Sequence, residues 1–129
     1  MDASLLRASF DLIESRKDEF AEAFYNRLFE KYPETRQFFA QTDMPKQART
    51  LAATLAVVVA GVEKGENLVP TLQSLGARHK TYNVLPEHYP LVGEILLETF
   101  QSTLGPQWTS AYQGAWIEAY QVIAQTMAG

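Results

Sequence analysis

The sequence contains no cysteine and only two histidines, and both scarcities restrict its chemistry. Without cysteine the chain can form no disulfide bond and can supply no thiolate to zinc or to an iron–sulfur cluster. A reactive site must therefore use nitrogen and oxygen atoms. His79 and His88 are separated by Pro86, so they do not share a helix face as paired zinc ligands would.

Basic residues and long apolar runs are also scarce. Lys and Arg total 11 against 15 Asp and Glu, giving a formal net charge of -4, and the basic residues are scattered, which argues against nucleic-acid binding. The longest apolar run, residues 51–62, is interrupted by Thr54 and Gly61 and is too short to cross a membrane. No secretory signal is visible at the first residues. We therefore expect a soluble cytoplasmic protein in which residues 1–129 form a single domain.

Apolar residues recur at spacings of three and four, and no segment alternates as a strand would, so we predict an all-α fold. A first helix is expected over residues 4–13. Ser15 followed by Asp18 is typical of a helix N-terminus, and this second helix should end before Pro33, where a turn-rich stretch begins. Short connections suit either a four-helix bundle or globin-like packing at larger crossing angles.

Asparagine, aspartate, proline and glycine mark the remaining helix boundaries. Asp43 can cap a long helix that carries Pro45 in its first turn, where a missing N–H does no harm. Gly61 and Gly65 are expected to break that pattern, and Asn67 can cap the next helix. We expect Pro70 in the first turn of that helix and close packing against Gly76. Pro86 should start the following helix, with Pro90 delaying its first turn, and Gly105-Pro106 should precede a last helix.

His79 ends an apolar helical stripe and is the most informative single residue. The stripe consists of Leu68, Leu72 and Leu75. An imidazole on an apolar face can bind a large flat cofactor that carries iron, but an isolated histidine of this kind is more often a core residue bonded to backbone carbonyls. Taken alone, Tyr25 is typical of a partly buried core tyrosine and Gln47 of an exposed helix residue. Spacing alone leaves both interpretations of His79 open.

Other polar residues indicate no second kind of chemistry. Glu63 with Glu66, and Glu94 with Glu98, have helical spacing in polar surroundings, which is typical of a solvated helix face. No serine stands in a nucleophile elbow, and no glycine-rich phosphate loop occurs. Hydrolase and nucleotide-binding functions are therefore disfavoured.

Several segments, in order along the chain, resemble one protein family. They are Phe24-Tyr25-Asn26-Arg27-Leu28-Phe29, Pro33-Glu34 with Phe38-Phe39, Gln47 with Leu51, Arg78-His79-Lys80, His88-Tyr89-Pro90-Leu91-Val92-Gly93-Glu94, and Ala115-Trp116 with Ala119-Tyr120. Together they are similar to bacterial single-domain haemoglobins, the branch related to flavohaemoglobin globin domains and the Vitreoscilla-type haemoglobin. The similarity extends over nearly the whole chain.

This resemblance implies a globin fold that holds haem b, iron protoporphyrin IX, between the long helix and the helix of His79. His79 would be the proximal iron ligand through Nε2, with its other ring nitrogen bonded to a carbonyl such as that of Leu75. Phe39 matches the phenylalanine that stacks on the porphyrin, and the distal pocket would contain Tyr25, Gln47 and Leu51. Further cofactor contacts are expected from Leu75, Arg78, Val84, Tyr89, Val92 and Trp116.

The resemblance also implies what the protein does. A phenol and an amide beside the iron predict reversible O2 binding with slow release and high affinity, for transport, storage or scavenging. The alternatives are a nitric oxide dioxygenase that converts NO and O2 to nitrate, and a gas sensor that acts through a partner. NO and CO are further expected ligands. Tyr89 matches a proximal tyrosine of flavohaemoglobins, but the glutamate that joins it would lie beyond Gly129. No flavin or nicotinamide segment follows either, so we expect an external reductase.

Overall fold

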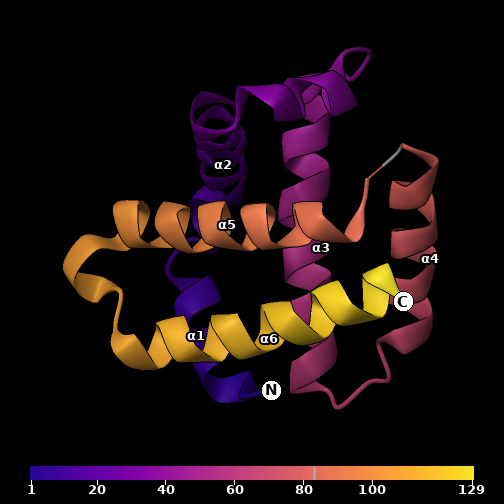
Figure 1. The fold of residues 1–129 in the computed structure, drawn as a ribbon. Helices are drawn as coiled ribbons and strands as arrows, with labels where there is room; N and C mark the ends of the chain where they lie inside the picture. Colours follow the sequence, from indigo (N-terminus) through magenta and orange to yellow (C-terminus); the bar gives the residue numbers. More distant parts are fainter. Residues whose placement is uncertain (83) are drawn as a thin grey trace.

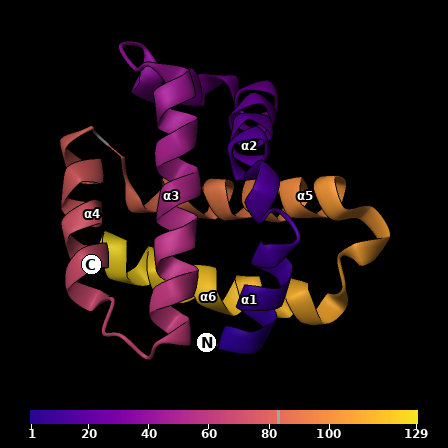
Figure 2. The ribbon, with the colours of Figure 1, turned by 180° about the vertical axis from the view of Figure 1, so that it is seen from behind.

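The computed structural model describes residues 1–82 and 84–129, and every regular element within them is helical. In Figure 1, α5 and α6 run across one face, α2 and α3 stand behind them, and α4 stands at one edge. Figure 2 shows the opposite face, with α1, α2 and α3 in front. The predicted all-α class is confirmed. The elements are α1 (Ala3–Asp11), η1 (Glu14–Arg16), α2 (Lys17–Lys31), η2 (Pro33–Phe39), α3 (Met44–Glu63), α4 (Val69–Thr81), η3 (Pro86–His88), α5 (Tyr89–Leu104), η4 (Gly105–Gln107) and α6 (Ser110–Ala128), where η denotes a short 3-10 helix.

Two predicted helix starts are confirmed. The Asp43 carboxylate accepts the backbone N–H of Lys46 at 3.3 Å, and Pro45 lies in the first turn of α3. At the start of α5, Pro86 opens the 3-10 segment η3, and the α-helix begins only afterwards, with Pro90 in its first turn. Proline therefore delays this helix as expected, because it has no N–H to donate.

Three boundary predictions are wrong in detail. Ser15 lies inside η1, and α2 begins at Lys17 without a side-chain cap. Gly61 does not break α3 but lies buried within it. Glycine is needed there for close packing, since a Cβ would come within 2.6 Å of the Leu68 side chain. Gly65 alone ends this region, with φ of 69°. Asn67 accepts the N–H of the first residue of α4 but lies one residue outside the helix cap.

The larger of two buried clusters, called the large cluster below, joins α1, α2, α5, α6 and most of α3. Phe100 lies at its centre, with its ring centroid 4.6 Å from that of Phe20 and 4.8 Å from that of Trp116. The Trp116 indole N–H donates to Ser9 Oγ at 2.8 Å, and the Ser9 hydroxyl donates to the carbonyl of Leu5. This buried polar chain is fully paired and fixes α6 against α1.

The second cluster, called the small cluster below, secures α4. It consists of the buried residues Val58, Leu68, Leu72, Tyr89 and Met127. Gly76 lets α4 approach α6 closely, since a Cβ there would lie 2.1 Å from the carbonyl oxygen of Met127. The predicted close-packing role of Gly76 is confirmed, because no side chain fits between the two helices at this point.

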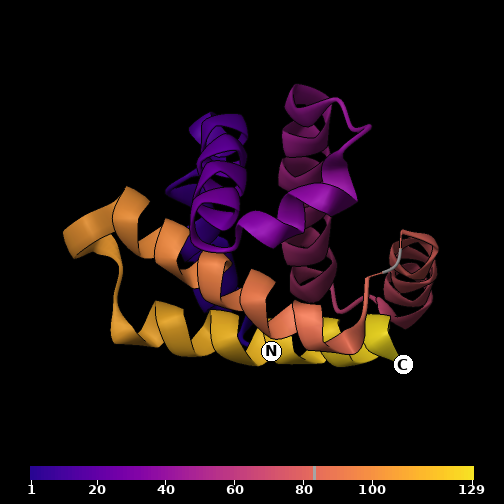
Figure 3. The same cartoon turned by 45° about the horizontal axis from the view of Figure 1, so that its top comes forward.

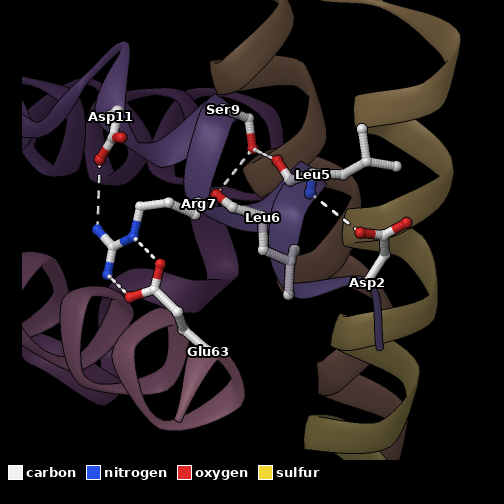
Figure 4. Close-up of polar contacts among 7 residues, drawn as sticks. All are labelled: Asp2, Leu5, Leu6, Arg7, Ser9, Asp11 and Glu63. Carbon is white, nitrogen blue, oxygen red and sulfur yellow. Dashed lines mark hydrogen bonds and ion pairs between the residues drawn. The ribbon is translucent and has the colours of Figure 1, made fainter.

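Arg7 joins the start of the chain to the end of α3 on the surface. Its guanidinium contacts the Glu63 carboxylate through two nitrogens, at 3.1 and 3.2 Å, and Asp11 at 3.3 Å, as Figure 4 shows. The pair is partly exposed, so we assign it a small contribution to stability. None of the described helices combines the length and the apolar character that crossing a membrane requires.

Candidate functional site

Gln47 and His79 lie on α3 and α4, which follow one another along the chain, and they lie toward the same side of the molecule. Helix α3 begins near η2 and α4 follows it in the opposite direction, so the start of α3 and the end of α4 face the same side of the molecule in Figures 1 and 2. Gln47 is in the first turns of α3, and His79 is near the end of α4. Figure 3 shows α4 standing apart from α3, whereas α4 packs closely on α6.

Tyr25 and Gln47 meet directly, although they are separated by 22 positions in the sequence. The Gln47 side-chain amide donates a hydrogen bond to the Tyr25 hydroxyl oxygen at 3.0 Å. The Tyr25 side chain is 7% exposed, and burial raises the pKa of its hydroxyl, while the hydrogen bond from Gln47 acts in the opposite sense. The phenol is therefore neutral at physiological pH and still has its own O–H proton to donate.

Two phenylalanines enclose the Tyr25 ring. Its centroid lies 5.4 Å from that of Phe39 and 6.1 Å from that of Phe29, and these two rings meet edge to face at 5.4 Å. Phe39 comes from η2, whereas Phe29 follows Tyr25 by one turn of α2. Phe29 is absent from the pocket residues that the sequence predicts, although its spacing of four from Tyr25 places it on the same helix face.

His79 is held through one ring nitrogen. Its Nδ1 lies 2.8 Å from the carbonyl oxygen of Leu75, the interaction that we predicted. A carbonyl accepts but cannot donate, so Nδ1 carries a proton, and in the neutral imidazole Nε2 keeps a lone pair that a metal can bind. Tyr89 lies beside the imidazole, with ring centroids 6.4 Å apart and planes 31° apart. Burial raises the pKa of the Tyr89 hydroxyl.

Half-buried apolar side chains of both clusters are of a kind that can contact a large flat apolar group. Phe39, Leu51 and Val92 are half-buried against the large cluster, and Leu75 and Val84 are half-buried against the small cluster. Helix α3 contributes to both clusters. The helix face that carries Gln47 and Leu51 continues to Val58, which belongs to the small cluster. Apolar side chains, one imidazole with a free lone pair and one phenol with a free proton are a donor set suited to haem. Arg78 is exposed at the outer edge, where an anionic group could reach it.

Trp116, another residue that is expected to contact the cofactor, lies within the large cluster. The side chain is 1% exposed and lies in the large cluster between Phe100 and Ser9, on the side of α6 that faces α1. An indole needs a partner for its N–H wherever it is buried, and Ser9 supplies it here. Helical spacing could not distinguish a core tryptophan from one that lines a pocket.

His88 has a structural role that its sequence position did not indicate. Its Nδ1 accepts the backbone N–H of Leu85 at 2.9 Å, and its ring meets Phe38 edge to face at 4.9 Å. These contacts connect η3 to η2. Among the described residues, no group of three or more His, Cys, Asp and Glu side chains could hold a metal ion. Iron binding in the described part of the chain would therefore depend on His79.

Comparisons with known proteins agree with this geometry. The flavohemoprotein of Bacillus subtilis is 30% identical over 127 residues, which are 97% of this chain but 32% of that protein, so the chain spans about a third of its length. An uncharacterized globin-like protein of Aquifex aeolicus is 31% identical over 95% of this chain and 86% of its own.

Solved structures show the same similarity. An engineered carbene transferase from Rhodothermus marinus, also described as a candidate nitric oxide dioxygenase, has a TM-score of 0.84 at 30% identity, covering 98% of this chain and 87% of that chain. A bacterial globin from Campylobacter jejuni has a TM-score of 0.83 at 24% identity, covering 98% and 91%, and supports the fold. The family model named Globin matches residues 22–127. This chain therefore belongs to the globin family and has the globin fold that its sequence predicts.

Proposed function

We propose that residues 1–129 form one globin domain that binds haem b through Nε2 of His79 and binds O2 reversibly with high affinity. Haem would supply ferrous iron with one position open to a diatomic ligand. The hydrogen bond from Nδ1 to the Leu75 carbonyl supports the role of His79, because it selects the tautomer and holds the ring in one orientation. The half-buried Phe39 and Leu51 would cover the cofactor on the side of α3.

The single observation that carries the proposal is the hydrogen bond from Gln47 to Tyr25. Because the phenol oxygen already accepts this bond, its O–H proton is free to point at a ligand that gains negative charge. The raised pKa and the burial of Tyr25 keep this donor protonated and shielded from water. A donor of this kind would contribute about 1 to 2 kcal/mol and would slow the release of O2.

Absorption spectroscopy of the purified protein tests this proposal. We expect a haem Soret band, a five-coordinate ferrous form, and a stable oxygenated form that returns to the ferrous state when O2 is removed. CO and NO should bind at the same position. Protein that develops no Soret band after addition of hemin would contradict the proposal.

A second function, nitric oxide dioxygenase, is favoured by the names of the relatives. Several are flavohemoproteins, and the Rhodothermus marinus structure is described as a candidate nitric oxide dioxygenase. The reaction NO + O2 + e⁻ → NO3⁻ consumes one electron per turnover, which a separate reductase and its reduced nicotinamide would supply. Sustained conversion of NO to nitrate with such a reductase would favour the enzyme. A single turnover followed by slow reduction of the iron would favour reversible O2 binding.

A further inference from the structure

Arg36 lies in η2, the short 3-10 helix between α2 and α3, which runs from the end of one to the start of the other in Figure 3. A 3-10 helix has about three residues per turn, so Arg36 and Phe39 project from the same face of η2. Both reach one ring of α2. The guanidinium carbon of Arg36 lies 4.8 Å from the centroid of the Phe29 ring, and Phe39 meets the same ring edge to face at 5.4 Å.

Phe29 connects this contact to the phenol of the candidate site. Its ring centroid lies 6.1 Å from that of Tyr25, and Phe39 lies 5.4 Å from the same phenol ring. Phe29 and Tyr25 are both buried, whereas Arg36 is exposed. The guanidinium therefore lies on the solvent side of an aromatic group that surrounds the hydroxyl-bearing ring.

The positive charge of Arg36 is available to the Phe29 ring. None of the ion pairs among the described residues includes Arg36. A guanidinium is planar and weakly hydrated, so it can stack on an aromatic face while its edge stays in water. Because η2 is only 7 residues long and has no side-chain cap at its start, its position depends on side-chain contacts of this kind.

We propose that Arg36 is a positioning residue for O2 binding: by stacking on Phe29 it holds Phe39 against the Tyr25 ring, and so keeps the Tyr25 hydroxyl where it can donate to O2. This inference rests on the proposed function of Tyr25. The described aromatic contact of Arg36 is with Phe29, so its effect on the phenol passes through that ring. The rate of O2 release then depends on a cation at the protein surface.

The variant Arg36→Gln tests this, because it keeps a planar polar group and removes the charge. In the haem-free protein, the nuclear Overhauser contact between the rings of Tyr25 and Phe39 should weaken. In the ferrous haem protein with CO bound, the CO stretching band should move to higher wavenumber, since a displaced hydroxyl donates less well. O2 release should accelerate roughly 2- to 5-fold, as the loss of an exposed cation–π contact predicts.

Matched variants separate stacking from charge and from general loss of stability. Arg36→Lys keeps the cation without the planar surface and should give intermediate values. Arg16→Gln removes an exposed arginine at the other end of α2, without a described aromatic contact, and should leave the ring contact and the band unchanged. Ser9→Ala disturbs the large cluster and should also leave both unchanged.

A double-mutant cycle tests whether Phe29 carries the effect. Phe29→Leu keeps an apolar side chain but removes the aromatic face, so Arg36→Gln added to it should not accelerate O2 release further. An equal further acceleration in that background would overturn the inference. If Arg36→Gln fails to fold, the ring contact and the band of Arg36→Lys decide, and values equal to the wild type would contradict the role of Arg36.

An unchanged ring contact in Arg36→Gln, or the same change in Arg16→Gln, would also overturn the inference. The ring contact is measured without haem, so it tests the positioning role even if haem binding fails. Conversely, normal haem and O2 binding with an unmoved Tyr25 ring in Arg36→Gln would reject Arg36 and leave the proposed function standing.

Discussion

The large cluster and the small cluster hold their helices in different ways. In the large cluster Phe10, Ile95 and Phe100 are fully buried, and the one buried indole is paired with Ser9. In the small cluster every side chain retains some exposure, and within α4 only Leu72 and Gly76 are buried. Helix α4 therefore packs on α6 along one side and has little buried surface of its own.

This difference places His79, the proposed iron ligand, on the helix with less buried surface. A well-packed core resists local opening, whereas a helix with few buried contacts opens at a lower free energy. A ligand that binds only the closed state would stabilise it by mass action. We therefore expect haem to complete the packing of α4, while the large cluster forms without it.

Replacement of His79 should have the largest effect. His79→Ala removes the proposed iron ligand, and we expect haem affinity to fall by more than about 100-fold, since the loss of a hydrogen-bond partner behind a metal ligand already costs roughly 10- to 100-fold. Hemin titration followed at the Soret band measures this. His88→Gln is the histidine control and should bind haem nearly normally. Equal loss in both variants would show that His79 is not the specific ligand.

Removal of haem should loosen α4 selectively. In the haem-free protein we expect the amide hydrogens of α4 to exchange about 100-fold faster than in the haem-bound protein. This figure applies when free haem is at about 100 times its Kd, where binding stabilises the closed state by roughly 2.7 kcal/mol. Amides of α5 and α6 around Phe100 should stay protected in both forms. Hydrogen exchange resolved by residue provides the measurement. If removal of haem accelerated amide exchange equally in all helices, the expected difference in stability between the two clusters would be contradicted.

A methyl group at Gly76 should damage the small cluster without touching the large one. The Cβ of Gly76→Ala would lie 2.1 Å from a backbone carbonyl of α6, so no rotamer change can relieve the clash. We expect a loss of about 1 to 3 kcal/mol in the free energy of unfolding, together with weaker haem binding. Urea unfolding measures the former. Gly114→Ala is the control, and with open space around it should stabilise α6 by about 0.5 to 1 kcal/mol.

Loss of the Ser9 hydroxyl should affect the large cluster alone. Ser9→Ala leaves the buried Trp116 N–H without its partner and should lower the free energy of unfolding by about 1 to 2 kcal/mol. The O2 release rate should not change, because this pair lies away from Tyr25 and His79. An exposed serine, Ser102, is the control for the same substitution. A changed O2 rate in Ser9→Ala would mean that the two regions are coupled.

The sequence predicted the helices well where local chemistry decides them. The cap at Asp43 follows from a side-chain acceptor near the Lys46 N–H, and the delay at Pro86 and Pro90 follows from missing N–H donors. It failed at Gly61, because glycine can signal either a helix end or a close contact, and only the position of Leu68 shows which applies.

The candidate site was predictable through the ordered resemblance and not through spacing. The contact between Tyr25 and Gln47 joins helices 22 positions apart, and periodicity describes only one helix at a time. The same limit applies to the buried hydrogen bond between Trp116 and Ser9, which lie 107 positions apart. Residues whose partners are distant in the sequence leave no local pattern.

In the proposed function, Tyr25 donates its hydroxyl proton to O2 on a haem bound by His79, and the hydrogen bond from Gln47 leaves that proton free. Stopped-flow measurement of O2 release from wild-type protein and from Tyr25→Phe, with Tyr112→Phe as the control, tests it most directly. Loss of a donor that contributes about 1 to 2 kcal/mol should accelerate release roughly 5- to 30-fold in Tyr25→Phe and leave Tyr112→Phe unchanged. A release rate in Tyr25→Phe equal to that of the wild-type protein would contradict the account.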